Sequence, residues 1–121
     1  MVSIFIVEDD ESLLNLYKKA LNLNGHEVIA YAKDGEEAIN TFKKLEKKPD
    51  VILMDHRMPV KNGLEAAREI LAIDSDINII FASADKSVKE KALSLGIKSF
   101  KDKPFTLNRL FKNIEKALDS H

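Results

Sequence analysis

Three acidic side chains directly follow two apolar runs of this sequence. Glu8 and Asp9 come after the run from Val2 to Val7, and Asp55 ends the run Val51-Ile52-Leu53-Met54. Short apolar runs that are bounded by loop residues predict strands buried on both faces of a sheet. A charge at the carboxyl end of such a strand stands where open α/β sheets carry out their chemistry. Taken alone, Asp55 is better explained as a residue that caps the next loop.

Two more polar residues follow later runs in the same way. Ser83 follows the run from Ile77 to Ala82, and Lys103 follows a shorter, more polar run at 97–101. The carboxyl ends of parallel strands share one edge of a sheet, so three carboxylates, one hydroxyl and one ammonium group are expected together. Neighbouring carboxylates raise one another's pKa, and a hard divalent cation relieves the repulsion. Oxygen ligands without nitrogen or sulfur favour Mg²⁺ over Zn²⁺.

These groups also suit phosphoryl transfer. A carboxylate can attack phosphorus and form an acyl phosphate, and the reaction depends mainly on placement and on neutralising the equatorial oxygens. A bound cation and Lys103 would supply positive charge, while Ser83 would donate a hydrogen bond to a phosphoryl oxygen. The five residues therefore form a coherent site for receiving a phosphoryl group.

The elements that must position this site alternate strictly between strand and helix. Each apolar run is followed by a segment with helical spacing of its apolar residues, and the segments carry cap signals such as Asp34, Thr106 and the closing Gly25 and Gly96. The predicted strands are Val2 to Val7, Val28 to Ala30, 51–54, Ile77 to Ala82 and Ile97 to Lys101. This alternation predicts right-handed crossovers and a mainly parallel sheet with helices on both faces. No linker or repeat interrupts it, so one domain is expected over residues 1–121.

Composition narrows the class of protein. A chain of 121 residues with 45% hydrophobic and 32% charged residues fits one globular domain, and its net charge of −1 gives no reason to expect broad attraction to nucleic acid or to an anionic membrane. The absence of cysteine excludes disulfides, cysteine-based zinc sites and a thiol nucleophile. No apolar run approaches the length of a membrane span, and no signal peptide opens the chain. A cytoplasmic protein is expected.

Four motifs occupy the predicted strand ends in order. They are Val7-Glu8-Asp9-Asp10, then Asp55-His56-Arg57-Met58-Pro59 through Asn62-Gly63, then Ser83-Ala84, and finally Lys103-Pro104-Phe105. With these motifs, the whole chain resembles a response-regulator receiver domain of two-component signalling. The resemblance implies an α/β, flavodoxin-like (βα)5 fold, a doubly wound parallel sheet with strand order 2-1-3-4-5.

The resemblance also implies a role for each site residue. Asp55 would be the phosphoacceptor, assisted by Lys103 and Ser83. The Mg²⁺ ligands would be Asp9, Asp55, the backbone carbonyl of Arg57, and Glu8 through a bound water.

The resemblance further implies a conformational switch. Phosphorylation would draw Ser83 inward and let Phe100 follow, which would remodel the face built from the fourth helix, the fifth strand and the fifth helix. The Lys103-Pro104 bond would be cis. The implied partners are a histidine kinase or phosphotransfer protein and an unidentified downstream target on that face, with no direct contact to nucleic acid or membrane.

Two positions depart from the common family pattern. Arg57 can reach over the acids, although a solvent-directed side chain is an equal alternative, and we hypothesise that Arg57 and Asp85 set how fast water attacks the acyl phosphate. Lys98 stands where receivers that dimerise as winged-helix transcription factors usually carry an acid, so dimerisation of that type is not expected.

Several residues have simpler explanations, which stay open from the sequence. Asp10 and Glu11 are best explained as acids that favour the start of a helix. Ser83 equally suits a helix cap, Phe100 a core aromatic residue, and His56 is expected to point away from the site. The lysines of the last third form either a solvated surface or a basic docking face for an acidic partner: Lys86, Lys89, Lys91, Lys98, Lys101 and Lys103.

The same residues argue against three other functions. A receiver-like interaction module that is never phosphorylated is disfavoured by the complete site. A phosphohydrolase with an aspartyl nucleophile, as in haloacid-dehalogenase-like proteins, needs an Asp-x-Asp pattern after the first strand, which Glu8-Asp9-Asp10 does not supply. Nucleotide binding is disfavoured because no glycine-rich phosphate loop follows that strand.

Overall fold

Five parallel strands form one sheet in the order β2-β1-β3-β4-β5 in the computed structural model of this chain. The structure describes residues 2–56, 58, 60–97, 99–102 and 106–119. Strands and helices alternate strictly, as β1 (Ser3–Val7), α1 (Glu11–Leu23), β2 (Glu27–Ala32), α2 (Gly35–Lys44), β3 (Val51–Asp55), α3 (Gly63–Ile73), β4 (Asn78–Ser83), α4 (Lys86–Ser94), β5 (Ser99–Asp102) and α5 (Leu107–Asp119). The predicted α/β fold and strand order are confirmed.

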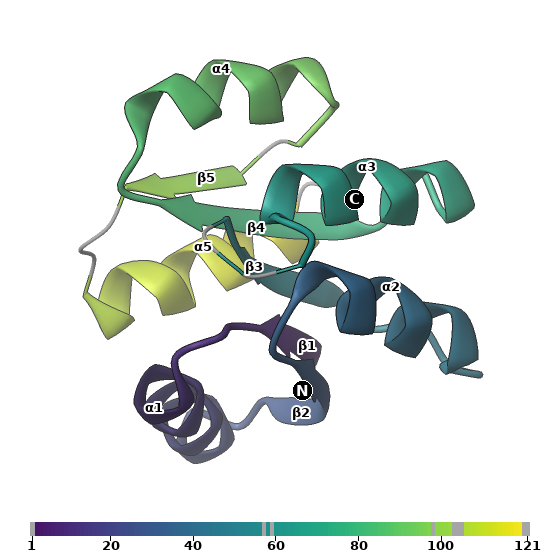
Figure 1. Cartoon of the computed structure of the whole chain (residues 1–121). Coiled ribbons are helices and arrows are strands. Elements are labelled where there is room, and N and C mark those ends of the chain that lie inside the picture. The colour runs from purple at the N-terminus through teal and green to yellow at the C-terminus, as the bar shows by residue number, and fades with distance from the viewer. Residues whose placement is uncertain (1, 57, 59, 98, 103–105, 120–121) are drawn as a thin grey trace.

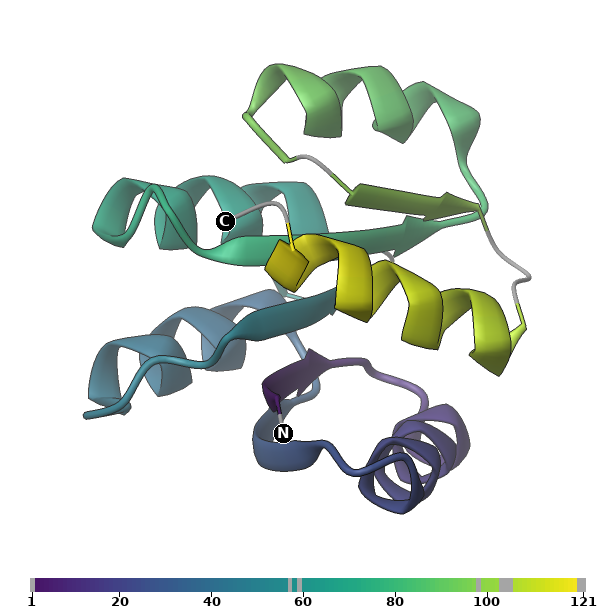
Figure 2. The same cartoon turned by 180° about the vertical axis from the view of Figure 1, so that it is seen from behind.

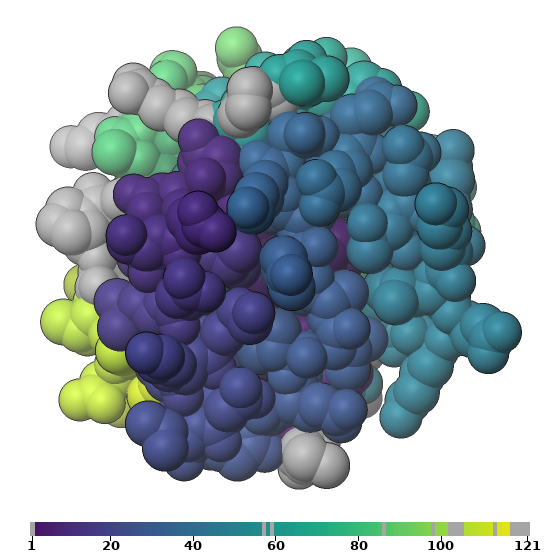
Figure 3. All heavy atoms as spheres, turned by 60° about the horizontal axis from the view of Figure 1, so that its bottom comes forward, coloured from purple at the N-terminus to yellow at the C-terminus, as the bar shows by residue number. Residues whose placement is uncertain are grey.

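The helices cover both faces of the sheet. One face carries α2, α3 and α4, and the other carries α1 and α5 (Figures 1 and 2). In Figure 3, most of the visible surface has the colours of the residues in and around α1 and α2. The colour of α5 appears only at one margin. The edge strand β5 has α4 on one side and α5 on the other, so these three elements form an end of the molecule distinct from α1 and α2.

Alternation along each strand divides the core into two layers. In β3, Ile52 and Met54 pack with α2 and α3, whereas Val51 and Leu53 pack with α1 and α5. All four side chains are buried, as a strand covered on both faces requires. The continuous apolar run that precedes Asp55 is therefore explained by helices on both sides of β3.

Polar side chains begin most of the helices. The caps accept a hydrogen bond from a backbone N–H in the first helical turn, at 2.8 Å for Asp34 to Glu37 and 3.1 Å for Asp10 to Leu13. Thr106 accepts from the N–H of Arg109 at 3.2 Å, which confirms its predicted role. Asp10, which was predicted only as an acid that favours the start of a helix, acts as the cap of α1.

Two strands differ most from the prediction, while the bounds of the other three differ by no more than one residue at either end. β2 runs from Glu27 to Ala32, longer than the predicted 28–30, because it continues to pair with β1 as far as Val7↔Ala32. β5 begins at Ser99 instead of Ile97. The N–H of Ile97 donates to the carbonyl of Ala92 at 3.2 Å and closes the end of α4, so it is not available to a strand ladder.

Gly63 brings the start of α3 against the end of β3. Its N–H donates to the carbonyl of His56 at 2.9 Å, and a Cβ built at this position would lie 2.3 Å from the carbonyl oxygen of Asp55. A backbone oxygen cannot move aside as a flexible side chain can. This close approach fixes the path of the chain immediately after Asp55.

Among the described residues, no helix is long and apolar enough to cross a membrane.

We expect Gly63→Ala to destabilise the protein by about 1–3 kcal/mol, because the added methyl group forces the start of α3 away from Asp55. Urea denaturation followed by circular dichroism measures the free energy of unfolding. Gly25→Ala is the matched control. Gly25 has φ +84° but nothing within 4 Å of an added Cβ, so only backbone strain of about 1 kcal/mol is expected there. A smaller loss at Gly63 than at Gly25 would contradict the proposed close packing.

Candidate functional site

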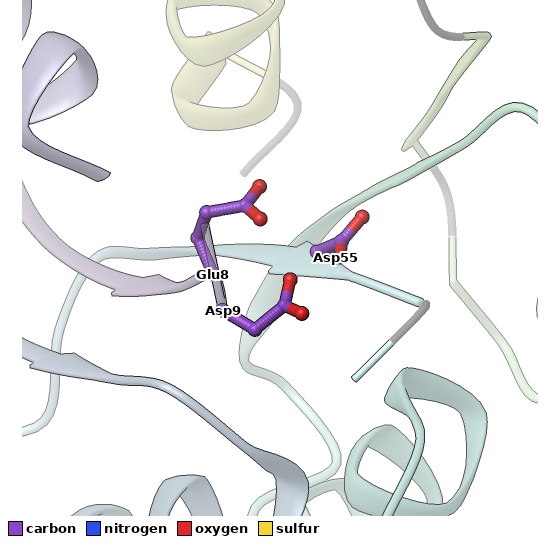
Figure 4. A group of neighbouring side chains, drawn as sticks. All are labelled: Glu8, Asp9 and Asp55. Carbon is purple, nitrogen blue, oxygen red and sulfur yellow. The ribbon is translucent and has the colours of Figure 1, made fainter. Parts of the chain in front are cut away.

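Three carboxylates gather at the carboxyl edge of the sheet. Glu8, Asp9 and Asp55 each offer one oxygen, and these oxygens all lie within 4.8 Å of one another. Figure 4 shows the three side chains approaching one another from the end of β3 and from the segment that follows β1. Glu8 and Asp55 are only 3% and 6% exposed, while Asp9 is exposed. The structure therefore brings together the three acids that the sequence predicted to meet.

Parallel pairing of β1 with β3 causes this meeting. The register places Val7 opposite Met54, so Glu8 and Asp55 are the next residues on neighbouring strands. The N–H of Glu8 donates to the carbonyl of Ala32 at 3.0 Å, which extends the backbone pairing to β2 beyond Val7. Its carboxylate accepts from the N–H of Asp10 at 3.2 Å. Hydrogen bonds with the backbone thus fix both the main chain and the carboxylate of Glu8.

Ser83 lies at the same edge, at the end of β4. Asp55 pairs with Ala82, and the next N–H along β3, that of His56, donates to the carbonyl of Ala82 at 3.3 Å. Ser83 is 3% exposed, and its hydroxyl oxygen accepts from the N–H of Asp85 at 3.0 Å. The hydroxyl predicted for this rim is therefore present, and it is tied to the chain that leads into α4.

Asp85 caps α4. Its carboxylate accepts from the N–H of Ser87 at 3.0 Å and from the Ser87 hydroxyl at 2.7 Å. The sequence offered Ser83 as a helix cap here, but the structure gives this position to Asp85. Ser87 was not predicted as a functional residue, although its place two residues after Asp85 is typical of a side chain that bonds a helix cap.

An aromatic row leads from the residue after Asp55 to β5. The His56 ring is tilted against Phe81 with centroids 5.9 Å apart, and Phe81 stacks on Phe100 at 6.0 Å. The histidine ring thus packs against a residue of the core layer that α2, α3 and α4 cover. Phe100 is half-buried. Phe81, which links the two, was missed by the sequence, although it lies directly opposite Phe100 in the β4–β5 register.

The loop between Asp55 and α3 has its own anchor, which the sequence did not reveal. The Lys61 ammonium lies 2.6 Å from Glu69 on α3 and 3.4 Å from Glu36 on α2. Its hydrogen bond to Glu69 raises the pKa of Lys61, and Glu36 adds to that effect, while desolvation works against it. The carbonyl of Lys61 accepts from the N–H of Gly35 at 3.0 Å. Both helices therefore hold this loop.

Some predicted roles lie outside the residues that the structure describes. Arg57 and Lys103 belong to this group, as does the predicted cis bond at Lys103-Pro104. Their roles in metal binding and phosphoryl transfer stay predictions.

The donor set of the site fits a hard cation. The grouped ligands among the described residues are carboxylate oxygens, two of them buried, and neither histidine nor cysteine joins them. Mg²⁺ binds through one or two carboxylates and keeps several waters, an arrangement that this set can satisfy from Asp9, Asp55 and Glu8. The geometry therefore supports a divalent-cation site next to one buried hydroxyl.

Comparison with known proteins bears on this site and fold. The model of the response regulator receiver domain matches residues 4–115. The chemotaxis protein CheY of Bacillus subtilis is 37% identical over 118 residues, which cover 96% of this chain and 97% of that protein.

Solved structures agree with that match. The receiver domain of the sensor histidine kinase PA1611 from Pseudomonas aeruginosa, with a magnesium ion coordinated in its active site cleft, is 28% identical with a TM-score of 0.86 and covers 98% of each chain. The response regulator TrrA from Thermotoga maritima, in complex with Mg²⁺ and BeF, is 29% identical with a TM-score of 0.85, covering 97% of this chain and 99% of that one. The fold, the edge that gathers three carboxylates and a hydroxyl, and these matches lead to one assignment: the chain belongs to the response regulator receiver domains of two-component systems.

Proposed function

We propose that this protein is a signalling switch that accepts a phosphoryl group on Asp55 in the presence of Mg²⁺. The observation that carries the proposal is the meeting of Glu8, Asp9 and Asp55 within 4.8 Å at the sheet edge, with the Ser83 side chain buried at the end of the next strand. The phosphoryl donor would be a histidine kinase or phosphotransfer protein, which implies a cytoplasmic location. The functional unit would be the single domain of residues 1–121.

The transfer itself is a substitution at phosphorus. A carboxylate oxygen of Asp55 attacks the phosphorus of a phosphohistidine, the new O–P bond forms as the P–N bond breaks, and the electron pair leaves with the imidazole nitrogen. The products are an acyl phosphate on Asp55 and a free histidine on the donor. Water later attacks the same phosphorus and restores the carboxylate. The protein thus assists its own phosphorylation and dephosphorylation, while its output is a changed surface.

The surrounding residues prepare this reaction. Asp9 and Asp55 would hold Mg²⁺ directly, the backbone carbonyl of Arg57 would be a further ligand, and Glu8 would act through a water. The cation would neutralise charge on the phosphoryl oxygens, and Lys103 would supply a second positive charge. Magnesium in the active site of the PA1611 receiver, and Mg²⁺ with BeF in TrrA, support this assignment.

The switch would start at Ser83. In this structure its hydroxyl accepts from the N–H of Asp85, the residue that caps α4. If the hydroxyl turns toward a phosphoryl oxygen, Asp85 loses that contact and the start of α4 is released. Phe100, which stacks on Phe81, would move with it and change the α4-β5-α5 surface, where a downstream target would bind.

We expect the wild-type protein to gain the mass of one phosphoryl group when incubated with acetyl phosphate and Mg²⁺, and Asp55→Asn to gain none, because the amide lacks the nucleophilic oxygen charge. Intact-protein mass spectrometry makes the measurement. Asp76→Asn is the control, since Asp76 is exposed and lies outside the site. A wild-type protein that gains no mass would support the interaction module instead, and steady turnover of a phosphoester would support a phosphohydrolase.

We expect Ser83→Ala to keep phosphoryl uptake on Asp55 but to lose the response of α4 and Phe100, because the methyl group cannot bond a phosphoryl oxygen. Backbone NMR shifts recorded with and without Mg²⁺ and BeF measure that response. Ser83→Thr restores the hydroxyl and serves as the matched control. A response of the Phe100 shift to Mg²⁺ and BeF that is as large in Ser83→Ala as in the wild type would contradict the proposed coupling.

We expect Arg57→Asn and Asp85→Ala to change the half-life of the acyl phosphate by roughly threefold or more, equivalent to a change in barrier of about 0.7 kcal/mol. Arg57→Asn should shorten it, since a smaller side chain leaves water freer access to phosphorus. Asp85→Asn is the control, because asparagine keeps the helix cap and removes only the charge. Decay rates equal to wild type in both test variants would rule the idea out.

A further inference from the structure

The formal charge of this chain is divided unevenly along its length. Residues 86–121 contain nine lysines and arginines against four acids, a net charge of +5, whereas residues 1–85 contain ten against sixteen, a net charge of −6. The total of −1 hides this division. The basic part includes α4, β5 and α5, which lie together at one end of the sheet (Figures 1 and 2).

Helix α5 concentrates the basic charge in a stripe. Arg109, Lys112 and Lys116 are exposed, and their spacing of three and four residues places them on one side of the helix, along about 10 Å of its length. The opposite side buries Leu110 and Ile114 in the core. We call the three cations the α5 basic stripe.

The cations of the stripe differ from several cations elsewhere in the molecule. Lys33 and Lys61 form ion pairs with acids, and Lys18 and Lys48 lie over aromatic rings. Between described residues, no ion pair involves a member of the α5 basic stripe. Within the described part of the chain, the stripe therefore carries charge that no ion pair uses.

We propose that the α5 basic stripe binds an acidic polypeptide segment. The proposal rests on the switch described above and specifies the chemistry of its downstream partner. Complementary charge steers association and selects the partner, and rim cations act mainly on the rate of association.

A protein segment fits this surface better than nucleic acid or an anionic membrane. Glu115 is exposed next to Lys116 on α5, and it would repel a uniformly charged phosphate backbone. The acidic remainder of the molecule would repel an extended polyanion as well. A short acidic segment can contact the cations without lying along the exposed glutamate or the acidic remainder of the molecule.

The test selects peptides from a random library displayed on phage, using the full protein loaded with Mg²⁺ and BeF. We expect the enriched peptides to be rich in Asp and Glu and to bind more weakly as salt is raised. In Arg109→Glu/Lys112→Glu/Lys116→Glu, the affinity for these peptides should fall roughly tenfold or more. The glutamine versions of the three changes remove charge without reversing it, and they keep the test valid if the glutamate variant does not fold.

The matched control is Lys43→Glu/Lys44→Glu/Lys47→Glu, which reverses three exposed charges at and after the end of α2 and should leave affinity unchanged. Peptides without an acidic excess, or equal binding by the α5 variants and wild type, would overturn the proposal. Stripe-dependent binding to DNA, to phosphatidylserine vesicles or to a second copy of the chain, stronger than to any peptide, would also overturn it. Acidic peptides that bind equally with and without BeF support the partner chemistry but contradict the phosphorylation switch.

Discussion

Two buried carboxylates on neighbouring parallel strands are the constraint on which the site depends. Glu8 and Asp55 are forced together by the β1–β3 register, and each has little contact with solvent. Burying charge in this way is costly unless a cation or hydrogen bonds compensate for it. The fold could avoid the cost with apolar residues, as it does one position earlier with Val7 and Met54. The two buried acids therefore support the proposed site for a cation and a phosphoryl group.

Two separate connections lead from residues near these acids toward α4 and β5. One runs through hydrogen bonds, from Ser83 to Asp85 and its cap on α4. The other runs through packed rings, from Phe81 to Phe100 on β5. The first ends on α4 and the second on β5, the edge strand that has α4 on one side and α5 on the other, so a change at the phosphoacceptor has a physical route to the α4-β5-α5 end of the molecule.

The sequence predicts the topology and the acidic site because both follow from one regularity, the alternation of apolar runs with helical segments. What it does not reveal depends on contacts between distant segments. Lys61, in the loop before α3, pairs with Glu36 of α2, and no spacing in the sequence predicts that ion pair. Phe81 was taken as part of a buried strand, and its link to Phe100 emerges only when β4 and β5 are set in register. The start of β5 was misplaced since the end of α4 uses the N–H of Ile97.

Screening by salt limits how far the charge of a phosphoryl group can act. An acyl phosphate on Asp55 would carry a charge close to −2, about one unit more negative than the carboxylate that it replaces, at the edge that also holds Glu8 and Asp9. Exposed charges are screened over about 8 Å at physiological salt, so the field of that group fades before it can reorganise distant cations on the solvent side of α5. Salt does not screen a displacement that is passed between packed side chains. The aromatic row and the Ser83–Asp85 connection are therefore better suited than long-range electrostatics to transmit the signal, while the basic surface is left to choose the partner.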